Sequence, residues 1–447
     1  MSIKKENPKI DFVQNEHEIL KYWSEKDIFK KLVLKNSNGP KWSFLDGPIT
    51  ANNPMGVHHA WGRTLKDLYQ RYKAMNGYQL RYQNGFDCQG LWVEIEVEKE
   101  LGIKSKKEVE ELGIEKFVNL CKDRVLKYSE IQKNQSIRLG YWMDWENSYF
   151  TMSEENNYAI WAFLKKLFED NKIYRGTDVV PWSGRSGTSY SQMEIIEGRK
   201  LTVHKGVFVK FPVKDSDNEN ILIWTTTPWT LSSNIAVAVN KKINYAKIKV
   251  KDDTIYYVAE TNLKYQRLSK EFSEKKNWVE GVPKLKTLDQ IFKERGGYEV
   301  IEVLKGENLI GLNYSGPFDH LEPQKTVGGY PIIDKNNINK KTAIDCHVII
   351  DGGKDSEGND MVVEGEGTGF VHMAGGCGAI DNKICKKEGF VEISPIDNQA
   401  NFLEGFDFMS GLNVTDAQTA EEIISNLKER DLLLYVEDYP HIYPHCW

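Results

Sequence analysis

Two histidines near the start of the chain are placed where they suit phosphate chemistry. A Gly-Pro turn at residues 47–48 and a polar segment at residues 51–56 lead to His58 and His59, which begin an amphipathic segment. Helix N-termini attract anions, because their free N–H groups and the helix dipole face the ligand. Imidazole donors there can hold a nucleotide triphosphate as charge develops during phosphoryl displacement. On these two residues alone, capping or packing of the helix is an equally good interpretation.

A run of hydroxyl side chains forms a second candidate site. It consists of Thr225, Thr226, Thr227, Thr230 and Asn234, with a Trp on each side of the first three threonines. Consecutive β-branched hydroxyl residues are typical of an ordinary exposed strand, which is the simpler interpretation. The flanking Trp residues and the Asn favour instead a small pocket lined by hydroxyl donors.

A glycine-rich segment at residues 367–381 contains His372 and ends in Asp381. Glu364 and Glu366 precede it and would repel a phosphate, and no Gly-Lys-Ser/Thr follows, so we do not expect a phosphate-binding loop. Taken alone, His372 fits a hydrogen-bonded structural histidine better than a functional one.

The elements that must position the first site follow from hydrophobic spacing. Residues 11–35 predict an N-terminal helical segment, residues 42–45 a short strand, and residues 57–77 a helix with Trp61, Leu65, Leu68, Tyr69 and Tyr72 on one face. A strand at 79–83, a loop at 84–90 and a helix from residue 91 follow. Strand, helix and strand in this order indicate a βαβ unit and the start of a parallel sheet. A capping box, Thr151-x-x-Glu154, predicts the start of a later helix.

After about residue 200 the pattern becomes β-rich. Short β-branched or aromatic runs at 207–211, 221–224, 235–239 and 256–258 are separated by polar turns, with a helix at 417–430. The sequence therefore predicts a β-rich domain inserted into an α/β domain.

Composition limits the class of protein. The chain has 447 residues, 40% hydrophobic and 28% charged, with 59 basic and 65 acidic side chains giving a net charge of −6. We expect a globular protein of two or three domains, without a membrane span and with nucleic acid bound only by local basic patches. Its 6 cysteines show no CxxC spacing, which favours a reducing, cytoplasmic location and no metal site.

The motif around the histidines resembles class I aminoacyl-tRNA synthetases of the isoleucine/valine/leucine group. Residues 46–59 resemble the segment that leads into the family motif His-Ile-Gly-His, and residues 85–94 resemble its Gly-Trp-Asp-Cys-His-Gly-Leu-Pro stretch. The resemblance implies catalytic roles for His59 and His58, and substrate binding by Pro48 and by Asp87, which would receive the α-ammonium group. Gly56 stands where the family has its first histidine and His58 where it has glycine, so His58 must replace the missing imidazole or the helix must shift.

The later segments resemble the inserted editing domain of the same synthetases. Thr-Thr-Thr-Pro-Trp-Thr at residues 225–230 is the form of the isoleucine-specific members, whereas valine and leucine enzymes carry Thr-Thr-Arg-Pro. The resemblance implies a hydrolytic pocket with Asp381 on the substrate ammonium group and His372 near the ester. Water would be the attacking group, because no Ser-His-Asp or Cys-His arrangement can be identified.

The resemblance implies a Rossmann-like, incomplete catalytic domain of the α/β class with an inserted editing domain. We expect helices at 1–40, the first catalytic half at 41–200, the editing domain at 201–435 and a return to the catalytic domain at 436–447. The Lys-Met-Ser-Lys-Ser loop of the family is absent, so we expect the chain to be truncated. Ser183 and Ser186 stand where many relatives place zinc-binding cysteines, so we predict no zinc.

The implied function is an isoleucine–tRNA ligase. It would use ATP with Mg²⁺ to activate isoleucine, transfer it to tRNA(Ile) and hydrolyse misacylated valyl-tRNA(Ile), as a cytoplasmic monomer without a membrane partner. The alternatives are a stand-alone aminoacyl-tRNA deacylase or tRNA-binding fragment, and a paralogue that has lost ATP chemistry. A valine or leucine enzyme is the least favoured, because Trp229 follows Pro228.

Overall fold

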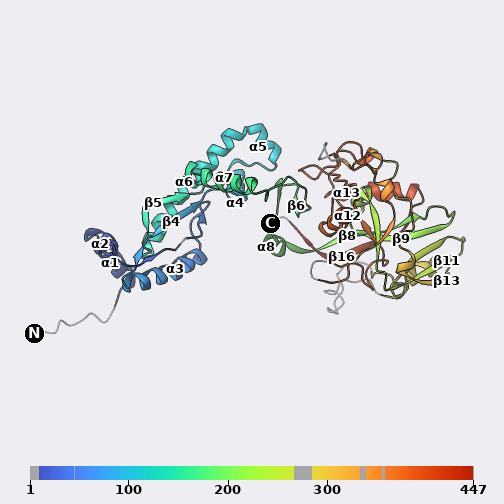
Figure 1. The fold of residues 1–447 in the computed structure, drawn as a ribbon, viewed down its shortest axis with the longest axis horizontal. Helices are drawn as coiled ribbons and strands as arrows, with labels where there is room; N and C mark the ends of the chain where they lie inside the picture. Colours follow the sequence, from blue (N-terminus) through green and yellow to red (C-terminus); the bar gives the residue numbers. More distant parts are fainter. Residues whose placement is uncertain (1–9, 45, 266–283, 333–338, 355–357, 446–447) are drawn as a thin grey trace, which may run out of the picture. The chain divides into compact units, whose positions relative to one another are not determined.

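The computed structural model describes residues 10–44, 46–265, 284–332, 339–354 and 358–445. The chain divides into two compact units, Met1–Arg175 (unit 1) and Gly176–Trp447 (unit 2) (Figure 1). The predicted domain limits at residues 40, 200 and 435 stay predictions. Among the described helices, none is long and apolar enough to cross a membrane.

Unit 1 consists of helices joined by short strands. Its helices are α1 (Phe12–Glu25), α2 (Ile28–Lys35), α3 (Val57–Met75), α4 (Leu91–Leu101), α5 (Lys106–Leu112), α6 (Ile114–Arg138) and α7 (Glu154–Glu169). Its strands are β1 (Lys41–Trp42), β2 (Ile49–Thr50), β3 (Gln79–Leu80), β4 (Gln83–Asp87) and β5 (Asp144–Phe150).

The predicted parallel sheet is present in unit 1. Strands β2, β4 and β5 lie in that order and pair in parallel, with Thr50 opposite Asp87 and Phe86 opposite Phe150. The carboxyl ends of all three strands therefore meet at one edge. The predicted loop at 84–90 is wrong in its first half, because residues 84–87 continue β4. The sequence did not show this, since Asn84 and Gly85 are poor strand formers.

Helices α4 and α6 support this sheet. Val93 of α4 and Val125 of α6 are buried with Phe86 of β4, and Figure 1 shows both helices beside the sheet. Further along, Val97 of α4 packs in one cluster with Phe117 of α6. These contacts fix α6 next to the loop that joins β2 to α3.

Helix α3 has its apolar residues on the exposed side. Trp61 is 69% exposed and Leu68 63%, whereas Arg63 is only 1% exposed and Gln70 is also buried. The predicted helix and its face are present, but that face is not covered by the described part of unit 1. Its C-terminal turn is anchored by Ala74, which packs with Leu80 and Tyr82.

The structure refines one local prediction and corrects two others. The N-terminal helical segment is two helices, separated at Asp27, whose φ of 49° lies in the left-handed region. Helix α7 is capped by Ser153, which accepts from the backbone of Asn156, rather than by the predicted Thr151. The predicted strand at 42–45 is present only as β1, and residue 45 lies outside the described residues.

Unit 2 is built around two sheets. Its strands are β6 (Trp182–Ser183), β7 (Thr188–Ser189), β8 (Arg199–Pro212), β9 (Glu219–Thr225), β10 (Ala236–Val239), β11 (Asn244–Val250), β12 (Ile255–Ala259), β13 (Tyr298–Lys305), β14 (Ile349–Asp351), β15 (Val371–Met373) and β16 (Leu433–Pro444). Its helices are α8 (Gln192–Glu197), α10 (Leu288–Glu294), α11 (Glu322–Lys325), α12 (Ala379–Glu388) and α13 (Ala417–Glu429), with the 3-10 helix η1 (Pro228–Ser233).

The larger sheet has the order β13-β11-β12-β9-β8-β16 and is antiparallel except where β12 pairs with β9. Both of its faces are covered. Val207, Val209 and Phe211 of β8 face one buried cluster, and Phe208 between them faces another. This alternation is what a strand with side-chain period 2 requires. The α/β fold class is confirmed, with parallel strands in unit 1 and a mixed sheet in unit 2.

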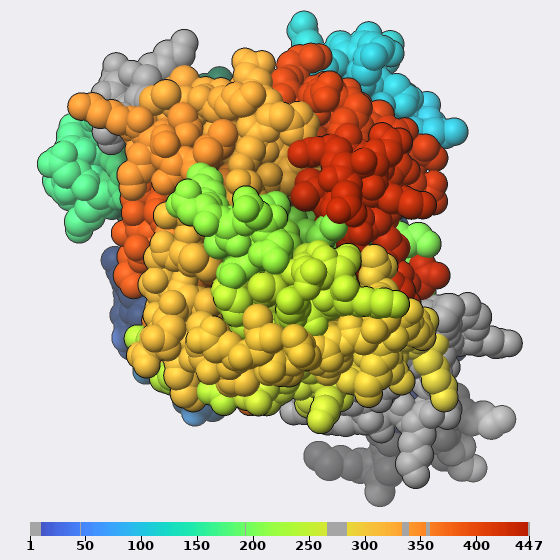
Figure 2. All heavy atoms as spheres, turned by 90° about the vertical axis from the view of Figure 1, so that its right-hand side faces the viewer, coloured from blue at the N-terminus to red at the C-terminus, as the bar shows by residue number. Residues whose placement is uncertain are grey.

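The smaller sheet has the order β14-β10-β15 and brings distant segments together. Strand β10 pairs in parallel with β14 and antiparallel with β15, with Val237 opposite His372. On the face shown in Figure 2, green atoms from early in unit 2 lie beside orange and red atoms from its later part. The threonine-rich run and the glycine-rich segment are thereby held next to each other.

Candidate functional site

Asp87 lies at the carboxyl edge of the parallel sheet. The hydroxyl of Thr50 donates to Asp87 Oδ2 at 3.0 Å, and that of Thr151 donates to Oδ1 at 3.4 Å. The backbone N–H of Cys88 donates to Thr151 Oγ1 at 2.9 Å. Residues at the carboxyl ends of β2, β4 and β5 thus hold one carboxylate where open α/β sheets bind ligands.

His59 is oriented by the backbone at the start of α3. The N–H of Gly56 donates to His59 Nδ1 at 3.1 Å, so in the neutral ring the proton is on Nε2. Burial lowers the pKa of His59, and the neighbouring His58 and Arg63 lower it further. His59 is therefore a neutral imidazole that can donate one hydrogen bond from Nε2.

The ring of His58 fills the space beside Gly56. The rings of His58 and His59 have centroids 3.8 Å apart. A Cβ placed on Gly56 would lie 2.9 Å from His58 Cε1. The glycine is therefore what allows the His58 imidazole to lie at this position of the loop.

The turn before β2 is anchored from α3. Asp46 is buried, forms an ion pair with Lys66 and lies 3.8 Å from Arg63 Nη1. Burial lowers the pKa of Arg63, and Asp46 opposes this shift. Pro48, two residues after Asp46, is half-buried and directly precedes β2.

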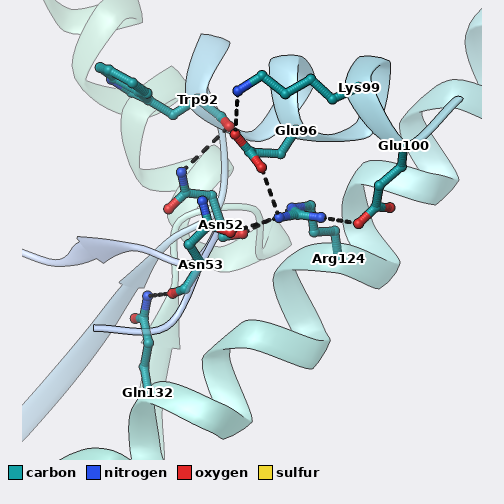
Figure 3. A network of polar contacts seen from close by, with 8 residues as sticks. All are labelled: Asn52, Asn53, Trp92, Glu96, Lys99, Glu100, Arg124 and Gln132. Carbon is teal, nitrogen blue, oxygen red and sulfur yellow. Dashed lines mark hydrogen bonds and ion pairs between the residues drawn. The ribbon is translucent and has the colours of Figure 1, made fainter. Parts of the chain in front are cut away.

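A polar network that sequence reasoning missed holds the loop at residues 51–56 (Figure 3). Arg124 Nε donates to the Asn52 carbonyl at 2.9 Å, and Nη2 donates to Asn53 Oδ1 at 2.8 Å. Gln132 Nε2 donates to the Asn53 carbonyl at 2.9 Å. The sequence signal that could have found this network is the position of two polar residues, Arg124 and Gln132, at helical spacing on the buried face of α6.

In unit 2 the threonine-rich run leaves the strand. Thr225 ends β9, and its Oγ1 lies 3.2 Å from Thr227 Oγ1 and accepts from the Thr227 N–H at 3.1 Å. Residues 228–233 form the helix η1. The alternative of an ordinary exposed strand does not describe this segment, because Thr225 and Thr230 are buried.

His372 meets this run through Thr230. Thr230 Oγ1 donates to the Thr227 carbonyl at 2.8 Å, so at its 3.0 Å contact with His372 Nε2 it must accept. Burial lowers the pKa of His372 to about 4, which leaves the ring neutral with its proton on Nε2. His372 Nδ1 is then a buried acceptor without a hydrogen-bond partner among the described residues.

Asp381 lies in the first turn of α12. Its Oδ2 accepts from the N–H of Ala374 at 2.9 Å, and burial raises its pKa. Beside it, burial raises the pKa of the Cys377 thiol to about 12, while contact with Ser233 lowers it.

Thr226 is half-buried, whereas Asn234 lies in the protein interior. Asn234 is 1% exposed, accepts from the Tyr314 hydroxyl at 2.7 Å and donates to the Ala236 carbonyl at 3.1 Å. Its amide therefore fixes the chain between η1 and β10. The structure joins Thr225, Thr227, Thr230 and His372 in one hydrogen-bonded group. Asn234 fixes the segment that follows this group through its bonds to Ala236 and Tyr314.

In the described part of the chain, no group of three or more His, Cys, Asp or Glu side chains has a metal-binding arrangement. Ser183 accepts from the backbone of Ser186 at 3.3 Å within the turn between β6 and β7. A surface cavity of about 450 Å³, lined from residues 320–322 and 404–410, contains none of the predicted site residues.

The sequence is similar to isoleucine–tRNA ligases over nearly its whole length. It is 35% identical to the isoleucine–tRNA ligase of Clostridium tetani over 436 residues, covering 98% of this chain and 37% of that protein. It is 36% identical to that of Clostridium acetobutylicum (99% and 37%) and 34% identical to that of Sulfolobus acidocaldarius (98% and 38%). The chain thus spans little more than a third of the length of these relatives.

A structural comparison gives a weaker likeness. The Agrobacterium radiobacter K84 LeuRS in its ternary complex with tRNA and LeuAMS has a TM-score of 0.34 and 14% identity, covering 98% of this chain and 49% of that one. The profile of the tRNA synthetases class I (I, L, M and V) matches residues 18–305. This match covers more than half of the chain, which therefore belongs to the class I tRNA synthetases of the isoleucine, leucine, methionine and valine group.

Proposed function

We propose that this chain carries the amino-acid activation half-site and the editing pocket of an isoleucine–tRNA ligase. The observation that carries the proposal is the placement of Asp87, His58 and His59 at the carboxyl edge and adjoining helix start of one parallel sheet. The isoleucine–tRNA ligases matched over 98% of the chain support the choice of amino acid. The complete reaction would belong to a protein of the length of those relatives.

In the activation step, the carboxylate of isoleucine attacks the α-phosphate of ATP and pyrophosphate leaves. Asp87 accepts the substrate α-ammonium group through a charge-assisted hydrogen bond, oriented by Thr50 and Thr151. Neutral His59 donates from Nε2 to phosphate oxygens, where negative charge increases in the transition state. Mg²⁺ that accompanies ATP neutralises phosphate charge. Pro48 directly precedes β2, whose last residue, Thr50, donates to Asp87.

His58 supplies the second imidazole. Its ring lies against Gly56. The family motif has histidine at position 56 and glycine at position 58, and this chain has the reverse. An imidazole therefore still lies beside the loop. Two adjacent imidazoles at a helix N-terminus suit a polyanionic substrate.

In the editing step, water attacks the ester carbonyl of valyl-tRNA(Ile), and valine and tRNA leave. We assign Asp381 to the valine ammonium group and His372, whose Nε2 bonds Thr230, to the side of the pocket near the ester. Thr225, Thr226, Thr227 and Thr230 limit the size of the pocket. Asn234 fixes the position of these threonines through its bonds in the interior.

A second pocket is needed for a physical reason. Valine lacks one methylene group of isoleucine. In an apolar pocket, one methylene group gives only about 1–3 kcal/mol of discrimination between two substrates, and isoleucine enzymes are the standard example of this limit. A site that admits valine and excludes isoleucine by size removes the remaining errors.

The test is hydrolysis of aminoacylated tRNA(Ile) by the chain of residues 1–447. We expect valyl-tRNA(Ile) to be hydrolysed faster than isoleucyl-tRNA(Ile), and Asp381→Ala to abolish hydrolysis, because the ester is no longer positioned. Asp438→Ala, which removes an exposed ion pair with Lys205, is the matched control and should keep full activity. Preference for the isoleucyl ester, or an active Asp381→Ala variant, would show that the editing assignment is wrong.

A stand-alone aminoacyl-tRNA deacylase is the second candidate. It is favoured by the two buried clusters of unit 2, which need no residues from unit 1. It predicts the same hydrolysis but no ATP chemistry in any longer form of the protein. We propose tRNA(Ile), isoleucine and ATP as the partners, a monomeric cytoplasmic enzyme, and no zinc in this chain.

A further inference from the structure

Arg124 is a buried cation that joins three segments of unit 1. It is only 7% exposed, and its guanidinium contacts the loop at 51–56 on one side and helix α4 on the other. Toward the loop it donates to the Asn52 carbonyl and to Asn53 Oδ1. Toward α4 it forms ion pairs with Glu96, at 3.4 Å, and with Glu100. Two carboxylates offset the cost of burying the charge and set the plane of the guanidinium.

The loop at 51–56 is held mainly by side chains of α6. Gln132 Nε2 donates to the Thr50 and Asn53 carbonyls at 3.0 and 2.9 Å, and the N–H of Met55 donates to Gln135 Oε1 at 2.8 Å. The loop then ends at Gly56, whose N–H fixes Nδ1 of His59. A continuous set of bonds therefore runs from Arg124 through the loop to the imidazole.

We propose that Arg124 is a positioning residue that fixes this loop and, through Gly56, the orientation of His59. Its consequence for adenylate formation rests on the proposed function, but the positioning itself does not. The planar fork of arginine is required, because one nitrogen must reach a backbone carbonyl while another reaches the Asn53 amide. A lysine can keep a carboxylate partner but cannot make both loop bonds.

The chain offers a matched control for the loss of ion pairs. Lys106 of α5 pairs with Glu94 and Glu98 of the same helix α4, at 2.8 Å for Glu98. Among the described residues, both ion pairs of Lys106 are with α4. Lys106→Gln should therefore lower stability without changing the loop.

The experiment compares hydrogen exchange and histidine titration in the chain of residues 1–447 and in three variants. In Arg124→Met we expect exchange of the amides of residues 52–60 to rise at least about tenfold, and the pKa of His59 to rise toward its ordinary value as the ring gains solvent. The side chains that lower the pKa of His59 besides burial, His58 and Arg63, are unchanged in every variant. His372 and His441 of unit 2 serve as internal references.

Arg124→Lys should fold and still show loosened loop amides, which keeps the proposal testable if Arg124→Met fails to fold. Lys106→Gln should leave both the loop amides and His59 as in the wild type. The proposal is overturned if Arg124→Lys protects the loop as the wild type does, or if Lys106→Gln loosens it equally. Neither measurement uses ATP or tRNA, so a failed activity assay would count against the proposed function and not against the positioning role.

Discussion

At the scale of single residues, the first site depends on an exchange between Gly56 and His58. The backbone at Gly56 has a φ of −80°, which any residue can adopt, so its glycine is needed for space and not for conformation. The space is taken by the His58 ring. The exchange therefore preserves the imidazole while moving its point of attachment by two residues.

This exchange predicts compensation between two substitutions. In a chain extended to the length of the isoleucine–tRNA ligases it resembles, His58→Gly should lower isoleucine-dependent pyrophosphate exchange by on the order of 10²-fold, as expected for a lost transition-state donor. Adding Gly56→His to that variant restores the family order and should recover much of the rate. Gly56→His alone crowds the His58 ring. Unchanged exchange in His58→Gly would mean that His58 only packs against the loop.

At the scale of elements, the antiparallel pair β8 and β16 carries a contact between two histidines. His441 Nε2 lies 2.9 Å from His204 Nδ1, and one of the two atoms must donate. Burial lowers the pKa of His441 to about 4, with His204 as a further cause, and burial also lowers that of His204. The two neutral rings suit the pairing, and protonation of both would oppose it.

This contact predicts that the strand pair opens more readily in acid. Because the closed form has the lower pKa, the open form binds more protons between the ordinary value near 6.5 and about 4. Stability of the pair should therefore be intact above pH 6.5 and fall as the pH decreases through this range. Hydrogen exchange of residues 199–212 and 433–444, followed over this pH range, measures it.

The control variants separate this contact from its surroundings. His441→Gln should flatten the pH dependence, whereas His17→Gln, an exposed histidine in α1, should leave it unchanged. Other polar groups on the pair are engaged: Lys205 with Asp438 at 2.8 Å, Glu437 with Trp224 at 3.0 Å, and His445 with Thr202 at 3.2 Å. A pH profile that persists in His441→Gln would contradict the prediction.

At the scale of the whole molecule, helix α3 has its polar side buried and its apolar side exposed. Along α3, Val57, Trp61, Leu68 and Met75 are exposed, and α7 similarly exposes Trp161. Contiguous apolar faces of this kind are rare on a monomer unless something covers them. The chain also spans only 37% of the Clostridium tetani relative.

These exposed faces predict an incomplete activation site. The chain of residues 1–447 alone should give no isoleucine-dependent pyrophosphate exchange, and it should bind an apolar fluorescent dye. Trp61→Gln with Leu68→Gln should reduce dye binding without lowering the melting temperature, because both side chains are already exposed. Robust exchange by the chain alone would contradict this prediction.

The sequence by itself determined the class of fold and the identity of the candidate residues. Local signals sufficed for the helices from residues 57, 91 and 417, since periodicity and flanking turn residues act within one segment. The motif residues 46–59, 85–94, 225–230 and 367–381 likewise point to their chemistry through residue type and short spacing. The placement of Asp87, His59 and the threonine run as functional groups stays a prediction.

Only the tertiary structure decided which groups meet and what each can do. Thr230 and His372 are 142 positions apart, and their contact fixes the imidazole proton on Nε2, which no local pattern encodes. Arg124 reaches a loop 72 residues away, and its role follows from packing of α6 rather than from any motif. The inverted polarity of α3 arises for the same reason. Helical spacing defines a face, but burial depends on what else packs against it.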